Sequence, residues 1–252
     1  MPNGNNDSNI LTAPESRRFQ HQIDLKQIGI SGQERLKNSK VVVIGAGAIG
    51  AQVLQFLAAV GIGSITIVDD SMVLEKDVQV QTLYGGRDLG KLKTIISRQQ
   101  LQNLYPFTKF DILNLRVTAH NILNFLGDCD LVVDATNSPS SNYIINDACI
   151  RLNKSWVYGS TSDFSAELTV FNYLSGPSYR CLYPDNNAPD TKAVSPANVY
   201  GVLGSLMANE CVKAILASKE VLSGRILNFD LYSNIFVQQT FERIEANFNI
   251  PK

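Results

Sequence analysis

The chain has 252 residues, of which 44% are hydrophobic, and its formal net charge of −1 accompanies a pI near 6.1. This composition supports one large α/β domain with a full core, and it excludes the strongly basic surface typical of proteins that bind nucleic acid or anionic membranes. No apolar run approaches the ~20 residues of a membrane helix. We therefore predict a cytoplasmic protein with neither nucleic-acid nor membrane partners.

The amino-terminal region divides into a tail and an arm. Residues 1–15 are rich in Asn, Pro and Ser and lack the basic and apolar regions of a secretory signal, so we predict a disordered tail. Residues 16–36 carry spaced apolar side chains among charges, which predicts a helical arm and a short connector. Residues 16–252 are predicted to form a single domain.

The most informative segment follows this arm. Residues 41–44 are a β-branched run, which is typical of a strand buried on both faces. Gly45, Gly47 and Gly50 come next and allow a tight turn with close approach of the backbone to phosphate. An apolar helix is predicted at 51–60, and the free amides at its beginning suit phosphate oxygens. The pattern predicts a nucleotide-binding turn.

A second strand supplies the acidic group that such a turn requires. Residues 65–68 form this strand, and Asp69 and Asp70 follow it. Asp69 lies about 20 residues after Gly50, which is the spacing of an acid that accepts hydrogen bonds from ribose hydroxyls. The simpler alternative is a glycine turn that only lets a helix pack on the sheet. The agreement of both strands and the acid favours nucleotide binding.

The middle of the chain continues the alternation of strands and helices. A helix is predicted at 91–104, and strands are predicted at 110–115 and 131–134. This order is typical of an α/β fold with a doubly wound, Rossmann-like and mostly parallel sheet.

The carboxyl-terminal part has a different character. Strands at 156–159, 167–172 and 225–232 and a long helix at 200–217 predict an antiparallel extension of the sheet. Between them, residues 175–196 are polar and rich in proline. We predict a loop there that is too irregular for the core and long enough to cross over a bound substrate.

Motifs along nearly the whole chain resemble those of the MoeB/ThiF (HesA) family of ubiquitin-activating-type adenylyltransferases. The similar segments, in family order, are 18–23, 32–36, 57–63, 79–84, 88–93, 179–184 and 201–206. The resemblance implies that the terminal carboxylate of a ubiquitin-like sulfur carrier, or a related small carboxylate, attacks the α-phosphate of ATP. The products are an acyl adenylate and pyrophosphate. It also implies Mg²⁺ and a homodimer.

The same resemblance assigns roles to individual residues. Asp69 matches the acid that holds the ribose, and Lys93 matches the lysine that reaches the phosphates. The remaining residues of the implied nucleotide site are Gly45, Gly47, Ala48, Gly50, Asp70, Asn137 and Ser138. Ala48 stands where the family has a glycine.

Several implied catalytic positions are substituted. His21 replaces an arginine that reaches into the neighbouring subunit's site, Val80 replaces a second phosphate-binding arginine, and Asp77 replaces an asparagine. Asn137 replaces the magnesium-binding aspartate, and an amide is a poorer ligand for a hard cation than a carboxylate. Asp134 is a candidate to take over the metal, although at a strand end it equally suits a cap.

The cysteines also depart from the family pattern. Ser178 occupies the first place of the family's first CxxC pair, which leaves Cys181 alone, and no cysteine follows Cys211. We therefore predict no structural zinc. Two functions remain open: an ATP-dependent adenylyltransferase with a depleted catalytic set, or a catalytically silent partner of a carrier protein or an active paralogue. A nicotinamide-dependent dehydrogenase shares the glycine turn but explains none of the later motifs.

Overall fold

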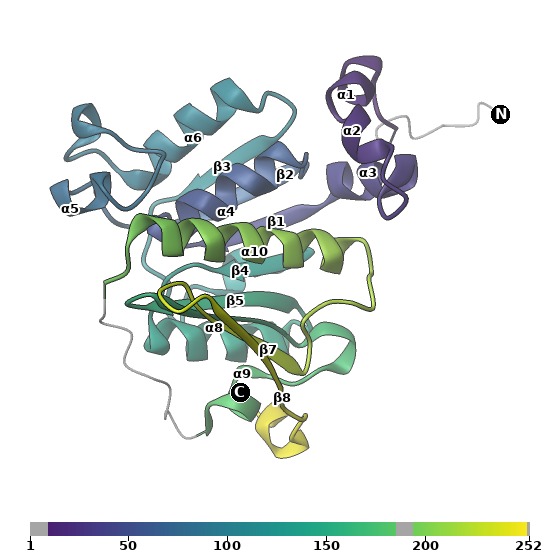
Figure 1. Cartoon of the computed structure of the whole chain (residues 1–252), viewed down its shortest axis with the longest axis vertical. Helices are drawn as coiled ribbons and strands as arrows, with labels where there is room; N and C mark the ends of the chain where they lie inside the picture. Colours follow the sequence, from purple (N-terminus) through teal and green to yellow (C-terminus); the bar gives the residue numbers. More distant parts are fainter. Residues whose placement is uncertain (1–9, 185–193, 251–252) are drawn as a thin grey trace.

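The computed structural model describes residues 10–184 and 194–250 of the chain. Its centre is an eight-stranded sheet with the order β3-β2-β1-β4-β5-β6-β7-β8, and helices cover both faces (Figure 1). The strands are β1 (Lys40–Ile44), β2 (Ser64–Val68), β3 (Lys109–Leu113), β4 (Leu131–Asp134), β5 (Ser155–Ser162), β6 (Ser165–Phe171), β7 (Arg225–Asp230) and β8 (Ile235–Thr240). The predicted fold class is confirmed.

The parallel half of the sheet contains β1 to β5, with β1 between β2 and β4. All residues of β1 after Lys40 are buried, because helices cover both faces of a β-branched strand. Ile44 is in register with Val68 on one side and with Asp134 on the other. The carboxyl ends of three neighbouring strands therefore meet at one edge, which is where open α/β sheets bind ligands.

The helices form two layers. On one face, side chains of α4 (Ala48–Ala59), α6 (Lys93–Leu104) and α10 (Ala197–Ile215) join the sheet in one core cluster. On the other face, a second cluster includes side chains of α7 (Leu123–Leu126), α8 (Pro139–Arg151) and α9 (Tyr179–Leu182). The remaining short elements are α5 (Glu75–Val78), η2 (Gly86–Asp88), η3 (Tyr173–Ser175) and η5 (Glu245–Phe248).

The amino-terminal arm consists of α1 (Ala13–Arg18), α2 (Gln20–Ile23) and α3 (Gly29–Asn38), and it projects from the body of the molecule in Figure 1. Helix α1 begins before the predicted end of the tail at residue 15. The reason is a capping box, in which Thr12 N donates to Glu15 Oε2 at 2.7 Å. Lys37 pairs with the same oxygen at 2.9 Å. Residues 1–9 lie outside the described part.

The carboxyl-terminal extension is antiparallel, as predicted, and joins β5 to β6, β7 and β8 in succession. No predicted strand corresponds to β8, whose residues are all exposed. A strand exposed on both faces lacks the alternation of apolar and polar residues that identifies a half-buried strand. In the described ranges, no helix is both long and apolar enough to cross a membrane.

The predicted loop at 175–196 is only partly a surface loop. Its first part contains α9, where Tyr179 is 1% exposed and packs against Trp156, Tyr158 and Phe171. The prediction that this stretch is too irregular for the core is therefore wrong for α9. Residues 185–193, where a crossing over substrate was expected, lie outside the described residues.

Candidate functional site

The glycine turn lies between the end of β1 and the start of α4. Gly45 has a φ of +100°, and a Cβ atom there would lie 2.6 Å from the Ala135 carbonyl oxygen. A Cβ atom on Gly50 would overlap the Gly45 carbonyl oxygen. Only glycine fits these two positions without movement of the backbone. Helix α4 begins after Gly47 with no side-chain cap, so the first-turn amides meet no capping side chain.

Asp69 fastens this turn to the end of β2. Its Oδ2 accepts a hydrogen bond from the Ala46 amide at 2.7 Å, and its Oδ1 accepts one from the Ser71 amide at 2.7 Å. A carboxylate has about four acceptor positions, so further positions remain for ligand hydroxyls. Asp69 therefore both shapes the turn and keeps the chemistry that a ribose contact requires.

Tyr84 supports the turn from within the core. Its hydroxyl lies 2.7 Å from the Ala46 carbonyl oxygen, to which it donates, and 2.7 Å from the Ser97 hydroxyl on α6. Burial raises the pKa of Tyr84 well above its usual value, so the hydroxyl stays protonated. The sequence motif at 79–84 contains this residue, but its contact with the turn is not visible in sequence spacing.

A pocket of about 270 Å³ opens beside the turn at the carboxyl ends of the strands. It brings together six residues predicted from the sequence: Gly45, Gly47, Asp69, Asp70, Lys93 and Ser138. It also contains polar residues that the sequence analysis missed: Ser71, Arg116, Thr136 and Ser141. Arg116 follows β3 without a recognisable motif, and only the fold brings it to this edge.

Lys93 is the buried cation of this pocket, with 8% of its surface exposed. Its Nζ lies 3.1 Å from Asp77 Oδ2, and both side chains are largely shielded from solvent. Asp77 also accepts a hydrogen bond from the Leu74 amide at 2.8 Å. The lysine expected to reach phosphates is thus paired with the carboxylate that replaces the family's asparagine.

Asn137 does not line the pocket, although Thr136 and Ser138 on either side of it do. Its φ of +50° is left-handed, a conformation that asparagine tolerates well. Its Oδ1 accepts hydrogen bonds from Ser160 Oγ at 3.0 Å and from the Thr161 amide at 3.1 Å. The residue therefore links the turn after β4 to the end of β5.

Asp134 is buried at the end of β4, with 1% of its surface exposed, and is not among the pocket-lining residues. Its Oδ1 accepts hydrogen bonds from the Thr136 amide and hydroxyl, whereas its Oδ2 is buried without a partner. Burial raises the pKa of Asp134 to about 6, against the opposing effect of the Thr136 hydrogen bonds. Within residues 10–184 and 194–250, no cluster of three or more His, Cys, Asp or Glu side chains could hold a metal.

The other predicted residues lie around the pocket rather than in its wall. Ala48 and Gly50 belong to the first turn of α4. His21 is exposed on α2, in the arm that joins the sheet at the beginning of β1. Val80 is half-buried and packs against the core. This chain alone therefore does not bring His21 or Val80 into the pocket.

The carboxyl-terminal segment is fastened to α9 by direct contacts near Cys181. The Ile244 amide lies 3.3 Å from Cys181 Sγ, to which it donates, and Asn247 Nδ2 donates to the Arg180 carbonyl oxygen at 2.9 Å. The Arg243 guanidinium lies 3.4 Å from the centre of the Phe248 ring and donates to the Gly176 carbonyl oxygen at 3.1 Å. The hydrogen bonds to Gly176, Arg180 and Cys181 hold this segment in place, and the cation–π contact lies within it.

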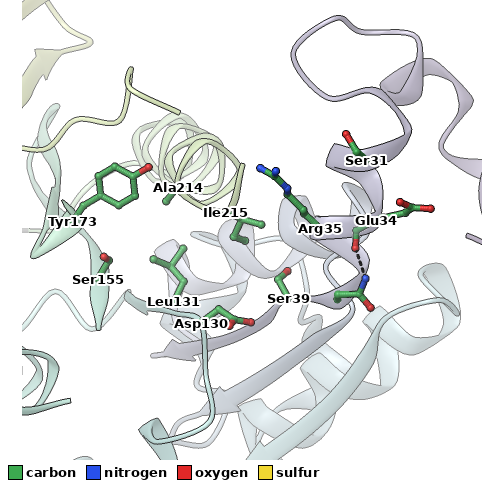
Figure 2. Close-up of a pocket in the computed structure, with 11 residues that line it drawn as sticks. Ser31, Glu34, Arg35, Ser39, Asp130, Leu131, Ser155, Tyr173, Ala214 and Ile215 are labelled. Atoms are coloured by element: carbon green, nitrogen blue, oxygen red, sulfur yellow. Dashed lines mark hydrogen bonds between the residues drawn. The ribbon is translucent and has the colours of Figure 1, made fainter. Parts of the chain in front are cut away.

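A larger pocket, of about 620 Å³, lies at the opposite edge of the sheet (Figure 2). Ser39, Asp130 and Ser155 line it at the amino ends of β1, β4 and β5. Four polar side chains of α3 also line it: Ser31, Glu34, Arg35 and Asn38. Parallel sheets bind ligands at the carboxyl ends of their strands, so volume alone does not identify the functional site.

The ThiF family model matches residues 19–249. The chain is 37% identical over 242 residues to a protein of Thermus thermophilus described as a sulfur carrier protein adenylyltransferase, and the match covers 92% of this chain and 89% of that protein. It is also 37% identical over 231 residues to the adenylyltransferase and sulfurtransferase MOCS3 of Culex quinquefasciatus, covering 90% of this chain. The chain spans 53% of that relative's length.

Two solved structures share the fold at lower identity. MccB of E. coli, crystallised with ATP, gives a TM-score of 0.79 at 22% identity and covers 94% of this chain and 75% of its own. PaaA gives a TM-score of 0.80 at 18% identity and covers 97% of this chain and 78% of its own. Both likenesses agree with the mostly parallel sheet and its antiparallel extension.

Proposed function

The chain belongs to the ThiF family, and we propose that it binds ATP and activates a carboxylate as an acyl adenylate. The observation that carries this proposal is one pocket that contains the glycine turn, Asp69 and Lys93. The proposed acceptor is the carboxyl terminus of a ubiquitin-like sulfur carrier or a related small carboxylate, in line with the described activity of the Thermus relative.

The residues present suit a nucleotide. A Cβ atom on Gly47 would meet nothing within 4 Å, so the backbone there is open to a ligand. The uncapped first turn of α4 offers amides and a positive dipole end to an anion. Asp69 retains acceptor capacity for sugar hydroxyls, and Lys93 and Arg116 are the cations that line the pocket. Together these groups supply amides and cations for phosphate and an acceptor for sugar hydroxyls, which suits an adenosine phosphate.

The chemistry asks the protein mainly to position two anions. Bound ATP supplies an electrophilic α-phosphate and a pyrophosphate leaving group. The α4 amides and Lys93 then hold negative charge in place, which is the main protein contribution in phosphoryl and nucleotidyl transfer. Asp69 fixes the sugar end, so that the α-phosphate has one orientation relative to the acceptor.

For Mg²⁺ we propose a site limited to Asp134 and Asn137. Magnesium bound to a nucleotide takes most of its ligands from phosphate and water and needs only one or two protein oxygens. Asp134 Oδ2 accepts no hydrogen bond, whereas Asn137 Oδ1 already accepts two. Asp134 is therefore the better candidate ligand of the two.

A second candidate function is a catalytically silent family member that binds a carrier protein or an active paralogue. The Lys93–Asp77 ion pair favours it, because the pair neutralises the one buried cation of the pocket. Val80 adds no charge. A homodimer remains part of the proposal, since His21 lies on an exposed arm and would serve only a neighbouring subunit's pocket.

Calorimetric titration with ATP, with and without MgCl₂, tests nucleotide binding directly. We expect saturable binding, and the absence of binding would overturn the proposal. Exchange of labelled pyrophosphate into ATP, measured with sulfur-carrier proteins as acceptors, then separates the two candidate functions. Exchange identifies the adenylyltransferase, whereas ATP and carrier binding without exchange identifies the silent partner.

A further inference from the structure

A second groove lies on the sheet face formed by β5, β6, β7 and β8, with a volume of about 330 Å³. Two rows of residues in register across the four strands line it: Ser160, Glu167, Asn228 and Val237, followed by Ser162, Ser165, Asp230 and Ile235. Residues directly opposite each other on antiparallel strands present their side chains on one face. The two rows therefore form one continuous surface.

This groove begins where the nucleotide pocket ends. Ser160, at one end of the first row, donates to Asn137 Oδ1 at 3.0 Å. Asn137 lies between Thr136 and Ser138, and both of these line the nucleotide pocket. A chain lying in the groove would thus have its end directed toward the pocket.

The dimensions suit a short extended peptide. Neighbouring strands lie about 4.8 Å apart, so the path across four strands is roughly 14 Å long. An extended chain advances about 3.3 Å per residue, which gives about four residues along the groove.

Two carboxylates form the middle of the groove. Glu167 accepts hydrogen bonds from the hydroxyls of Tyr158 at 2.5 Å and Tyr183 at 2.6 Å. Asp230 accepts from Ser165 Oγ and from the Ser233 amide, each at 2.7 Å, and these hydrogen bonds lower the pKa of Asp230 to about 2. Within the described parts of the chain, neither Glu167 nor Asp230 forms an ion pair with a Lys or Arg side chain.

The far end of the groove is apolar and open. Ile235 is 54% exposed and Val237 is 44% exposed, both on the edge strand β8. The groove therefore has three parts in order from the nucleotide pocket. The Ser160 end lies beside the pocket, the two carboxylates without a cationic partner follow, and the apolar surface of β8 comes last.

In the proposed function, the last residues of the acceptor lead its carboxylate to the nucleotide pocket, and this groove continues that path. We propose that Glu167 and Asp230, which line the groove, select a lysine or arginine near the acceptor's carboxyl terminus. The inference rests on the proposed function, because the acceptor must bring a carboxylate to the nucleotide pocket. A tail carrying acidic side chains would meet like charge in the groove, whereas a basic side chain would pair with both carboxylates.

The ligand side of the proposal is tested with three fluorescein-labelled peptides of sequence Ala-Val-Thr-Xaa-Thr-Gly-Gly, in which Xaa is Lys, Gln or Glu. Fluorescence anisotropy at low ionic strength measures their affinities for the full chain. We expect the Lys peptide to bind about five- to tenfold more tightly than the Glu peptide, with the Gln peptide between them. Equal affinities, or no binding of any peptide, would overturn the proposal.

The protein side uses Glu167→Gln, Asp230→Asn and the double variant. The preference for Lys over Glu should fall in each single variant and disappear in the double variant. Glu220→Gln and Asp128→Asn, which change exposed carboxylates outside the groove, are the controls and should keep the preference. Asp230→Asn alone remains decisive if Glu167→Gln weakens the Tyr158 and Tyr183 contacts and lowers the melting temperature.

Parallel ATP titrations of the same samples separate the two proposals. If ATP binds and the peptides show no charge preference, the groove assignment fails while the proposed nucleotide site stands. If the Lys preference is present and vanishes in the double variant but ATP does not bind, the proposed function fails and the groove assignment stands.

Discussion

The sugar end and the phosphate end of the nucleotide pocket differ in how their charges are used. At the sugar end, Asp69 is hydrogen-bonded to the glycine turn, and Tyr84 supports the same turn from the core. At the phosphate end, Lys93 is paired with Asp77, and Asn137 is hydrogen-bonded to β5. The difference teaches that the two charged groups serve different contacts: Asp69 joins the backbone of the turn, whereas Lys93 pairs with another side chain.

The largest expected effect comes from changing the turn itself. Gly50→Ala would place a methyl group on the Gly45 carbonyl oxygen, so the backbone of the turn must move. We expect a loss of about 3 kcal/mol in the free energy of unfolding and no detectable ATP binding. Urea denaturation and calorimetry measure the two effects. Gly127→Ala, at a helical glycine with open space around it, is the control and should change neither.

Asp134→Asn tests the buried carboxyl beneath the phosphate end. Burial raises the pKa of Asp134 in the folded state to about 6 from 3.8. Protonation of this carboxyl therefore stabilises the folded state. The stabilisation is complete below pH 3.8 and is lost as the pH rises through 6. Between pH 3.8 and 6, the free energy of unfolding of the wild type should fall by about 3 kcal/mol relative to that of Asp134→Asn. Above pH 6 the difference between the two proteins should stay constant. Denaturation at several pH values measures this difference, which should be flat for the exposed Asp128→Asn.

Asp69→Ala changes the sugar end of the pocket and also removes the hydrogen bond that fastens the glycine turn to β2. It removes a carboxylate that holds two backbone amides and is proposed to hold the ribose. We expect ATP affinity to fall about 10- to 100-fold, which corresponds to charged hydrogen bonds of about 1.5–3 kcal/mol. Calorimetric titration measures the change, with Glu220→Ala as the control. An unchanged dissociation constant would refute the ribose contact.

Asp77→Asn changes the phosphate end of the pocket and should raise the affinity for ATP, whereas Asp69→Ala should lower it. The change releases Lys93 from its ion pair while an amide oxygen still accepts from Leu74. We expect ATP affinity to rise about three- to tenfold, because a largely buried cation then lacks its internal partner. Glu75→Gln, an exposed carboxylate on the same helix, should have no effect. A fall in affinity for Asp77→Asn would show that Asp77 supports nucleotide binding rather than competing with it.

The sequence predicts those elements whose role in the fold requires a particular pattern of neighbouring residues. The run at 41–44 predicts β1 because a strand buried on both faces needs β-branched residues throughout, and the glycines predict the turn because backbone contacts forbid other side chains there. The spacing to Asp69 predicts its place in the pocket.

Features that depend on contacts between distant segments escape such reasoning. The pairing of Lys93 with Asp77 joins α6 to α5, and its consequence for charge is invisible when each residue is read alone. Arg116 reaches the pocket only because β3 lies beside β2. Tyr179 lies in a proline-rich stretch with the composition of a loop, yet it packs against aromatic side chains from β5 and β6.

The contacts around Cys181 have a consequence for how the carboxyl-terminal segment is attached to α9. The Ile244 amide donates to Cys181 Sγ and Asn247 Nδ2 donates to the Arg180 carbonyl oxygen, and these two hydrogen bonds join this segment to α9. The docking of these residues on α9 therefore depends on the position of the Cys181 side chain and of the Arg180 backbone, two groups of one short helix.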